Sequence, residues 1–398
     1  MSMISPVLWL FSICTAIPTA LYGMEVSMSF LRRQVAPSPA ERLPAAIIIP
    51  AHNEEDGIAR TVLSLASQMR PFDRLLVVAD NCTDATAEIA RAAGAEVLER
   101  TDLKLRGKGY ALDAGLQAIA QDPLPFVVFI DADCIIEAGG LDALVRASNA
   151  QSGAVQAVNL MLAPTGASIG TKVAEFAFLI KNKVRPKGLA RMGVGCQLTG
   201  TAMAFPWALI RDVNIASGNL VEDMKLGLDL TLVGKPPTLC ETSYIYSFFP
   251  QSKTGAATQR QRWESGHIAT ISEAFRALPK AQILKEPKLA LWMLDLLIPP
   301  LSLLLLSLVI VGMTEIGLII SFDMPAGPFT VTMLALMWLL GTTSLAWLKY
   351  GMTALPPKDL IQVLPYVISK IPLYLTIIAG RQNKSWIRTD RSNGSEPF

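Results

Sequence analysis

The chain has 398 residues, of which 51% are hydrophobic and only 17% are charged. Soluble proteins carry about 25% charged residues, so part of this chain is expected to lie in a membrane. The formal charge is +2, and no long basic or acidic block is present, which argues against a nucleic-acid partner. Five widely spaced cysteines and two histidines give no pattern for a structural zinc site.

Residues 7–24 form the first expected element, an uncharged apolar run just long enough to span a bilayer core. A cleaved signal peptide carries positive charge before its apolar stretch, whereas the first basic residues here are Arg32 and Arg33, after it. Because positive residues favour the cytosolic side, we expect residues 1–33 to form a transmembrane segment with the N-terminus outside.

Residues 36–286 have the character of one large cytosolic α/β domain, which is expected to end in an interfacial amphipathic helix at 259–285. Short β-rich runs alternate with helical stretches in this order: strands at 45–50, 74–80 and 125–133, and helices around 55–69, 84–94 and 108–120. This alternation predicts a mainly parallel sheet with helices on both faces. In such sheets, ligands bind at the carboxyl ends of the strands.

The C-terminal part, residues 287–380, returns to membrane character. Apolar runs at 289–312 and 329–348 are each long enough to cross a bilayer. A third run at 361–380 is broken by prolines and a lysine. If it crossed the membrane, the basic tail 381–398 would lie outside, although basic residues favour the cytosolic side. We therefore favour an interfacial or re-entrant segment, followed by a cytosolic tail.

Asp131 and Asp133 close the third apolar strand, and side chains two residues apart on a strand point to the same side. Two neighbouring carboxylates suit Mg²⁺ or Mn²⁺, which completes its coordination with substrate phosphates. The alternative is an aspartate-rich turn with no metal.

Other polar clusters also follow strands or begin helices. Asp80 ends the second strand and begins a loop, for which the alternative without a binding role is an Asx turn with Thr83 or Asp84 capping the next helix. The segment 106–109 precedes a helix and could offer cations and backbone N–H groups to a diphosphate, or be a solvated turn. Neither a Walker loop nor a Gly-x-Gly-x-x-Gly fingerprint is present.

Two further clusters lie later in the chain. Glu222 and Asp223 open an expected helix, where carboxylates also complement the helix dipole without any catalytic role. Gln259, Arg262 and Trp263 stand on a helical stretch, and arginines beside an aromatic residue are also typical of a membrane interface.

Together these clusters resemble the membrane-bound, inverting family-2 glycosyltransferases with the GT-A fold, the group that contains cellulose, chitin, hyaluronan and N-acetylglucosamine polymer synthases. The resemblance covers about residues 44–265. It rests on four motifs in the family's order: Pro50-Ala51-x-Asn53-Glu54, Asp80 with Asp84, Asp131-x-Asp133 and Gln259-x-x-Arg262-Trp263. The pair Glu222-Asp223 takes the place of the family's Thr-Glu-Asp, with Val221 in the threonine position.

The resemblance implies one inverting transfer from a nucleotide sugar, most often a UDP-sugar. Asp223 would be the general base, and Asp131 and Asp133 would hold Mg²⁺ or Mn²⁺ against the departing diphosphate. The donor would be bound by Ala51, Asn53, Glu54, Asp80, Lys108 and Asp131. The acceptor and the diphosphate would be contacted by Glu222, Gln259, Arg262 and Trp263.

The acceptor is expected to be a saccharide that grows into a β-linked oligo- or polysaccharide at an inner or plasma membrane. A channel that translocates a polysaccharide must be walled by helices, however, and only two or three membrane segments are expected after the domain, which is few for such a wall. Transfer of a single sugar to a lipid is therefore the alternative. A different class of function, that of a non-catalytic partner subunit or a transporter, is the remaining alternative. The intact set of acidic residues argues against the subunit, and the absence of evident paired repeats argues against the transporter.

Overall fold

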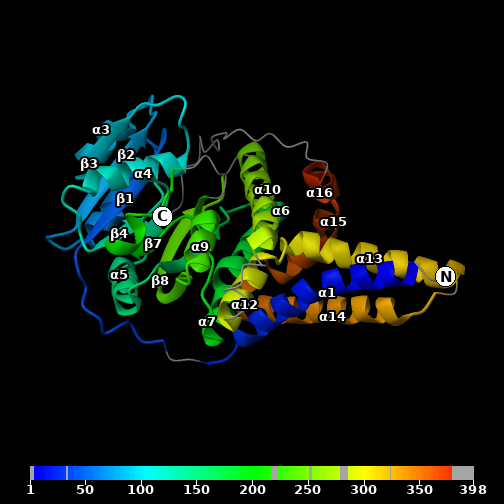
Figure 1. Ribbon diagram of the computed structural model, residues 1–398. Coiled ribbons are helices and arrows are strands. Elements are labelled where there is room, and N and C mark those ends of the chain that lie inside the picture. The colour runs from blue at the N-terminus through cyan, green and yellow to red at the C-terminus, as the bar shows by residue number, and fades with distance from the viewer. Residues whose placement is uncertain are drawn as a thin grey trace. The chain divides into compact units, whose positions relative to one another are not determined.

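The computed structural model in Figure 1 describes residues 4–32, 35–216, 222–250, 253–277, 286–322 and 324–378. Val221, residues 278–285 and the expected basic tail 381–398 lie outside the described residues. Over its described residues the chain divides into two compact units, which we call the helical unit (within Met1–Arg32, Thr165–Gly193 and His267–Lys384) and the sheet unit (within Arg33–Pro164 and Val194–Gly266).

The sheet unit contains a sheet of strands in the order β3-β2-β1-β4-β7-β6-β8-β5. Their bounds are β1 Ala45–Ala51, β2 Arg74–Asp80, β3 Glu96–Arg100, β4 Phe126–Phe129, β5 Ile135–Ile136, β6 Val155–Leu162, β7 Met203–Pro206 and β8 Thr238–Phe248. The pairings from β3 through β2 and β1 to β4 are parallel, as is β6 with β8. Strand β7 runs antiparallel to β4 and β6, and β5 runs antiparallel to β8.

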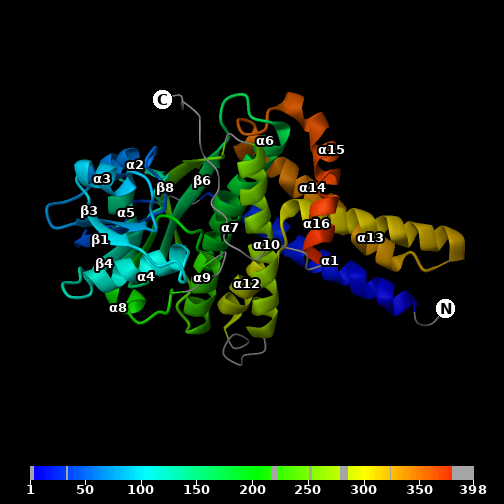
Figure 2. The same cartoon turned by 90° about the horizontal axis from the view of Figure 1, so that it is seen from above.

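Both faces of this sheet are buried under helices, as expected from its near-continuous apolar strands. Ile47 and Ile49 of β1 pack with α2 (Ile58–Ala66), α3 (Thr86–Ala92) and α5 (Gly140–Gln151). Ile48 points the other way and packs with α4 (Lys108–Ile119), α8 (Trp207–Ile210) and α9 (Glu222–Leu232). Figure 2 shows α2 and α3 on one side of the strands and α4 and α8 on the other. The expected mainly parallel α/β sheet with helices on both faces is confirmed.

One glycine sets how closely α4 approaches the sheet. A Cβ atom at Gly115 would lie 2.7 Å from Cγ2 of Ile48, closer than real side-chain contacts allow. Helix α4 can therefore lie flat on β1, which fixes the position of Lys108 at its first turn.

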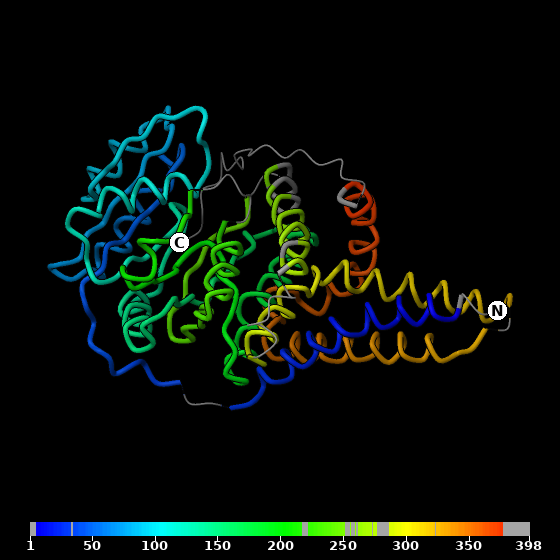
Figure 3. The backbone as a smooth tube through the Cα atoms, in the orientation of Figure 1, coloured from blue at the N-terminus to red at the C-terminus, as the bar shows by residue number. Residues whose placement is uncertain are grey.

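The helical unit contains α1 (Ile4–Met28), α6 (Ile169–Leu179), η1 (Ile180–Val184), α7 (Arg185–Arg191), α12 (Pro287–Leu296), α13 (Leu301–Phe322), α14 (Gly327–Ala346), η2 (Trp347–Gly351), η3 (Pro357–Gln362), α15 (Val363–Ile368) and α16 (Ile371–Ile378). Helix α10 (Lys253–Ala277) begins in the sheet unit and ends in the helical unit. Figures 1 and 3 show α1, α13 and α14 running side by side. Their shared core includes Tyr22, Leu308 and Leu339.

Within the described part of the chain, three helices are long and apolar enough to cross a membrane: Ser5–Met28, Leu301–Phe322 and Gly327–Gly351. The first and third correspond to the expected segments at 7–24 and 329–348. The expected single crossing at 289–312 is wrong, because α12 ends before Pro299-Pro300 and α13 begins after it. Proline lacks the N–H of a helical hydrogen bond and its ring collides with the preceding turn, so the pair separates two helices.

Two other segments differ in detail from the sequence analysis. Residues 165–193 belong to the helical unit, although no apolar run of membrane length marks them. The run at 361–380 forms the end of η3 and the short helices α15 and α16 over its described residues. Neither α15 nor α16 has the length of a transmembrane helix.

Candidate active site

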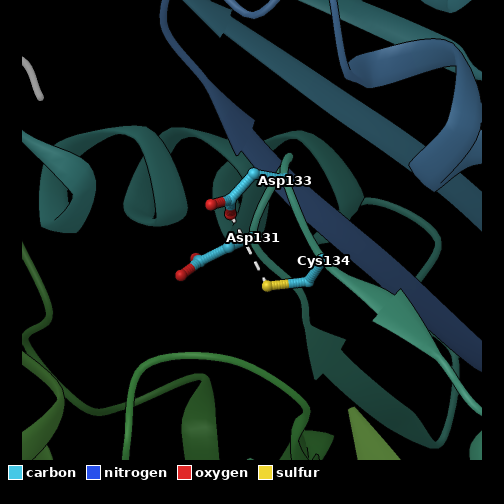
Figure 4. Close-up of side chains that lie close together, drawn as sticks. All are labelled: Asp131, Asp133 and Cys134. Carbon is cyan, nitrogen blue, oxygen red and sulfur yellow. Dashed lines mark hydrogen bonds between the residues drawn. The ribbon is translucent and has the colours of Figure 1, made fainter. Parts of the chain in front are cut away.

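Asp131 and Asp133 lie in a tight turn directly after β4, with Cys134 beside them (Figure 4). One side-chain ligand atom from each of these three residues lies within 4.8 Å of the others. The Cys134 thiol donates to Oδ1 of Asp133 at 3.5 Å. The cluster therefore presents two carboxylates on one side of the turn, although the strand ends at Phe129, before both aspartates.

The turn is fixed by hydrogen bonds from neighbouring elements. The backbone N–H of Asp131 donates to Oγ1 of Thr201 at 3.0 Å, and the Thr61 hydroxyl donates to the carbonyl of Ala132 at 2.7 Å. Thr61 and Thr201 are both buried. Sequence reasoning missed these two threonines, because neither lies in a motif or near the aspartates along the chain.

Lys108 connects this turn to the start of α9. Its Nζ lies 2.5 Å from Oδ1 of Asp131 and 3.6 Å from Oε1 of Glu222, and it donates to the carbonyl of Gly200 at 2.7 Å. A Cβ atom at Gly200 would lie 3.2 Å from both Lys108 Nζ and Oδ2 of Asp223. The structure thus brings Lys108, Asp131, Glu222 and Asp223 together around a glycine, whose φ of +88° also favours that residue.

Burial and the charges of neighbouring side chains together set the pKa values in this cluster. Burial lowers the pKa of Lys108, but the carboxylates of Asp131, Glu222 and Asp223 outweigh it and raise the pKa above its ordinary value. Burial raises the pKa of Asp131 and of Glu222, and the Lys108 ammonium only partly opposes this rise. Neighbouring carboxylates raise both values further.

The charge balance and the donor atoms fit a divalent cation. Asp131, Asp133, Glu222 and Asp223 supply four carboxylates, whereas Lys108 and Arg262 are the cations that act on them. The excess is negative, and its oxygen atoms are the hard ligands that Mg²⁺ and Mn²⁺ prefer. Asp131 and Asp133 are the residues that could hold such an ion.

A second group of expected site residues lies at the carboxyl ends of β1 and β2. Asn53 has a left-handed φ of 55°, and its Oδ1 accepts from the backbone N–H of Thr83 at 2.7 Å. A ring nitrogen of His52 lies 2.7 Å from the carbonyl oxygen of Asp80. The backbone N–H of Glu54 donates to Oγ1 of Thr86 at 2.8 Å, so the two loops are cross-linked.

Asp80 itself is paired with a residue that sequence reasoning missed. Arg100 Nη1 donates to Oδ1 of Asp80 at 2.5 Å, and the two residues lie opposite each other on β2 and β3. Ala51, the last residue of β1, is buried beside this loop pair. The helix cap considered for Thr83 or Asp84 is wrong, because the N-cap residue of α3 is Ala85, which makes no side-chain hydrogen bond. Oδ1 of Asp84, one residue earlier, accepts from the backbone N–H of Thr86 at 3.1 Å.

Gln259, Arg262 and Trp263 lie on α10. Burial raises the pKa of Glu222, and the charge of Arg262 opposes part of this rise, which places Arg262 within electrostatic reach of the acidic cluster. Gln259 is buried, and its Oε1 accepts no hydrogen bond from the residues that the structure describes. Trp263 is half-buried.

Comparison with known proteins identifies the chain's relatives. Residues 43–266 match the family described as "Glycosyltransferase like family 2". The 4,4′-diaponeurosporenoate glycosyltransferase of Staphylococcus aureus (strain USA300) is 39% identical over 90 residues, which are 22% of this chain and 23% of that protein. The chain thus matches less than a quarter of the length of this curated relative.

Two solved structures are similar to this chain to different degrees. A mannosyltransferase from Pyrobaculum calidifontis, in complex with GDP-Man and Mn²⁺, has a TM-score of 0.58 at 17% identity and covers 94% of this chain and 100% of its own. Glucosyl-3-phosphoglycerate synthase from Mycobacterium tuberculosis, with Mn²⁺, UDP and phosphoglyceric acid, has a TM-score of 0.39 at 22% identity over 56% of this chain and 76% of its own. The first likeness confirms the expected GT-A type of fold, and because the family match spans more than half of the sequence, the chain belongs to the glycosyltransferase-like family 2.

Proposed function

We propose that this protein transfers a sugar from a nucleotide-sugar donor to a membrane-borne acceptor, with inversion at the anomeric carbon. The observation that carries the proposal is the cluster of Lys108, Asp131, Glu222 and Asp223 at the carboxyl edge of the sheet. Family membership supplies the reaction class, and the cluster supplies the acid–base and charge-binding groups that this reaction needs.

Asp131 and Asp133 would hold Mg²⁺ or Mn²⁺, as the excess of carboxylates and their hard oxygen ligands support. When bound, such an ion supplies the positive charge that stabilises the departing diphosphate. The fold relative from Pyrobaculum calidifontis contains Mn²⁺ and GDP-Man, which agrees with this assignment. Arg262 and Gln259 on α10 would contact the same diphosphate, Arg262 by a charge-assisted hydrogen bond.

The nucleotide would bind against the cross-linked loops after β1 and β2. Ala51, Asn53, Glu54 and Asp80 line these loops, and the left-handed conformation of Asn53 turns the chain sharply at the strand's end. Rigid loops at this edge of an α/β sheet are the usual place for a nucleotide. The ion pair between Asp80 and Arg100 would fix the orientation of the Asp80 carboxylate toward the donor.

Asp223 would take the proton of the acceptor hydroxyl as that oxygen attacks the anomeric carbon. Its Oδ1 accepts from the backbone N–H of Met224 at 2.8 Å, which orients the carboxylate at the start of α9. Its Oδ2 faces the space left by the missing side chain of Gly200. One displacement by an oxygen from the opposite side inverts the anomeric centre. Trp263 would offer an apolar face to a sugar ring of the acceptor.

Among the two acceptor classes, a lipid-like acceptor has the stronger support. Within the described residues, only two candidate spans, in α13 and α14, follow the sheet unit, which is few for the wall of a polysaccharide channel. The curated relative is named for transfer to 4,4′-diaponeurosporenoate. Extension of a β-linked saccharide is the second candidate, favoured by the Gln259, Arg262 and Trp263 signature. With Arg32 following α1, the sheet unit would lie in the cytosol at an inner or plasma membrane.

The test uses purified full-length protein in lipid nanodiscs, radiolabelled nucleotide sugars one at a time, and a membrane lipid extract or soluble saccharides as acceptor. We expect label to enter the organic phase with one donor and to depend on Asp223. Label that enters only a water-soluble chain would support the polymer instead. If no nucleotide sugar donates label to either acceptor, the proposal is refuted.

A further inference from the structure

The loop between β3 and α4 carries an unusual surface. Leu103 is 67% exposed and Leu105 is 45% exposed, and they alternate with the exposed cations Lys104 and Arg106. A single exposed leucine is normal on a protein surface. Two of them in one short segment, interleaved with two basic side chains, have the composition of a surface that lies on a membrane.

This loop, residues 101–107, is held in a defined shape. Oδ1 of Asp102 accepts from the backbone N–H groups of Lys104 and Leu105, both at 2.9 Å. The backbone N–H of Asp102 donates to Oδ1 of Asn81 at 2.8 Å, which ties the loop to the end of β2. The exposed leucines are thus presented by an anchored turn, so little conformational entropy is lost when they become buried.

We propose that the Leu103–Arg106 segment docks onto an anionic lipid leaflet. Leu103 and Leu105 would enter the boundary between headgroups and acyl chains, and Lys104 and Arg106 would lie at the lipid phosphates. The three helices able to cross a bilayer mean that a lipid surface is available to this chain. The positive charge of Lys104 and Arg106 is complementary to anionic headgroups, and for this reason we propose anionic lipid as the partner of this surface.

The docked loop has a consequence for the site next to it. The segment runs through Gly107 directly into Lys108, which binds Asp131 at 2.5 Å. A loop held at the headgroups would keep the acidic cluster near the depth at which a lipid-borne hydroxyl group is found. Docking itself requires no sugar transfer, so it can be measured whether or not the proposed reaction occurs.

The test places an environment-sensitive dye on the loop. Leu103→Cys is labelled in a background in which Cys14 and Cys82, the two cysteines that are not buried, are replaced by serine. The matched control is Phe72→Cys, because Phe72 is 75% exposed. Phe72 precedes the amino end of β2, whereas the loop follows the carboxyl end of β3, so the two positions lie at opposite ends of these parallel strands. The length of β2 separates the two positions by about 20 Å.

Both labelled proteins are reconstituted in nanodiscs of phosphatidylcholine, with or without phosphatidylglycerol, that contain nitroxide-labelled lipid. We expect quenching of the dye at position 103 but not at position 72, and stronger quenching with the anionic lipid. Replacing Lys104 and Arg106 by glutamine should lower the docking equilibrium constant about fivefold for each cation.

Three results would overturn the proposal. The dye at position 103 could remain unquenched, or the dye at position 72 could be quenched equally, in which case the loop has no special contact with lipid. The dye at position 103 could instead be shielded from aqueous iodide without being quenched by lipid, which would mean that the loop contacts protein and not lipid. Because Leu103 and Phe72 are exposed, neither replacement removes a buried contact on which folding depends.

Discussion

Replacing Lys108 by methionine removes the cation that pairs with both Asp131 and Glu222. Methionine keeps the length and the apolar stem of lysine but removes the ammonium group. The variant leaves Asp131 and Glu222 without the charge that lies 2.5 Å and 3.6 Å from their carboxylates. We expect the sheet unit to lose stability, because like charges then face one another in a largely buried space.

The size of the loss follows from distance and burial. At 2.5 Å and an effective dielectric constant of about 20, the gross attraction between Lys108 and Asp131 is about 6 to 7 kcal/mol. Desolvation cancels much of this, and removing one partner of a fully buried pair costs about 3 to 5 kcal/mol. Because the Lys108 side chain is 22% exposed and that of Asp131 is 33% exposed, we expect about 2 to 3 kcal/mol.

The measurement is the thermal midpoint of the purified protein in detergent, with and without Mn²⁺. A loss of this size lowers the midpoint by about 5 to 10 °C, and Mn²⁺ should restore part of it by binding the freed carboxylate. The matched control is Lys225→Met, which removes a pair with Asp229 of the same length, 2.5 Å, but 38% exposed on both sides. This control should cost about 1 kcal/mol or less. Equal losses for the two variants would refute the claim that burial makes the Lys108 pair strong.

Three other predictions concern metal, acceptor and topology. Chelation by EDTA should abolish transfer and Mg²⁺ or Mn²⁺ should restore it, because Asp131 and Asp133 would hold the ion. Full turnover in the presence of the chelator would exclude a metal-binding role for the two aspartates. Trp263→Ala should leave UDP affinity nearly unchanged while raising the acceptor KM or lowering kcat. If donor hydrolysis and sugar transfer both fall only in proportion to the amount of folded protein, Trp263 has a structural role instead. A cysteine at Ser2 should react with an impermeant thiol reagent from outside and one at Ser395 should not, because basic residues follow the first span; labelling of both would mean that 361–380 crosses the membrane.

The strands were predictable where the sheet is buried on both faces. The runs expected at 45–50 and 74–80 correspond to β1 and β2 almost residue for residue, since a fully buried parallel strand reads as an uninterrupted apolar run. The run expected at 125–133 was too long, because the N–H of Cys134 donates to the carbonyl of Asp131 and closes a turn after β4. Apolarity alone does not distinguish the end of a strand from the turn that follows it.

Local motifs led to the candidate site residues. Asp131 and Asp133 are two residues apart and do lie together, but they stand in the turn after β4 and not in the strand from which their shared side was expected. The contact of Lys108 with the Gly200 carbonyl joins residues 92 positions apart, and no local pattern announces it. Arg100 opposes Asp80 only because β2 and β3 pair in one particular register. Such contacts depend on the tertiary fold and are not encoded in sequence spacing.

The central claim, that Asp223 is the general base of a glycosyl transfer, is tested most directly by Asp223→Asn. Asparagine keeps an oxygen that can accept from the N–H of Met224 but cannot take a proton at neutral pH. UDP affinity, measured by titration calorimetry, should stay close to that of the wild type, while transfer should fall by a factor of about 10² to 10⁴. Asp229→Asn, on the same helix and paired with Lys225, should leave the rate nearly unchanged. Normal turnover by Asp223→Asn, with UDP bound as in the wild type, would contradict the assignment.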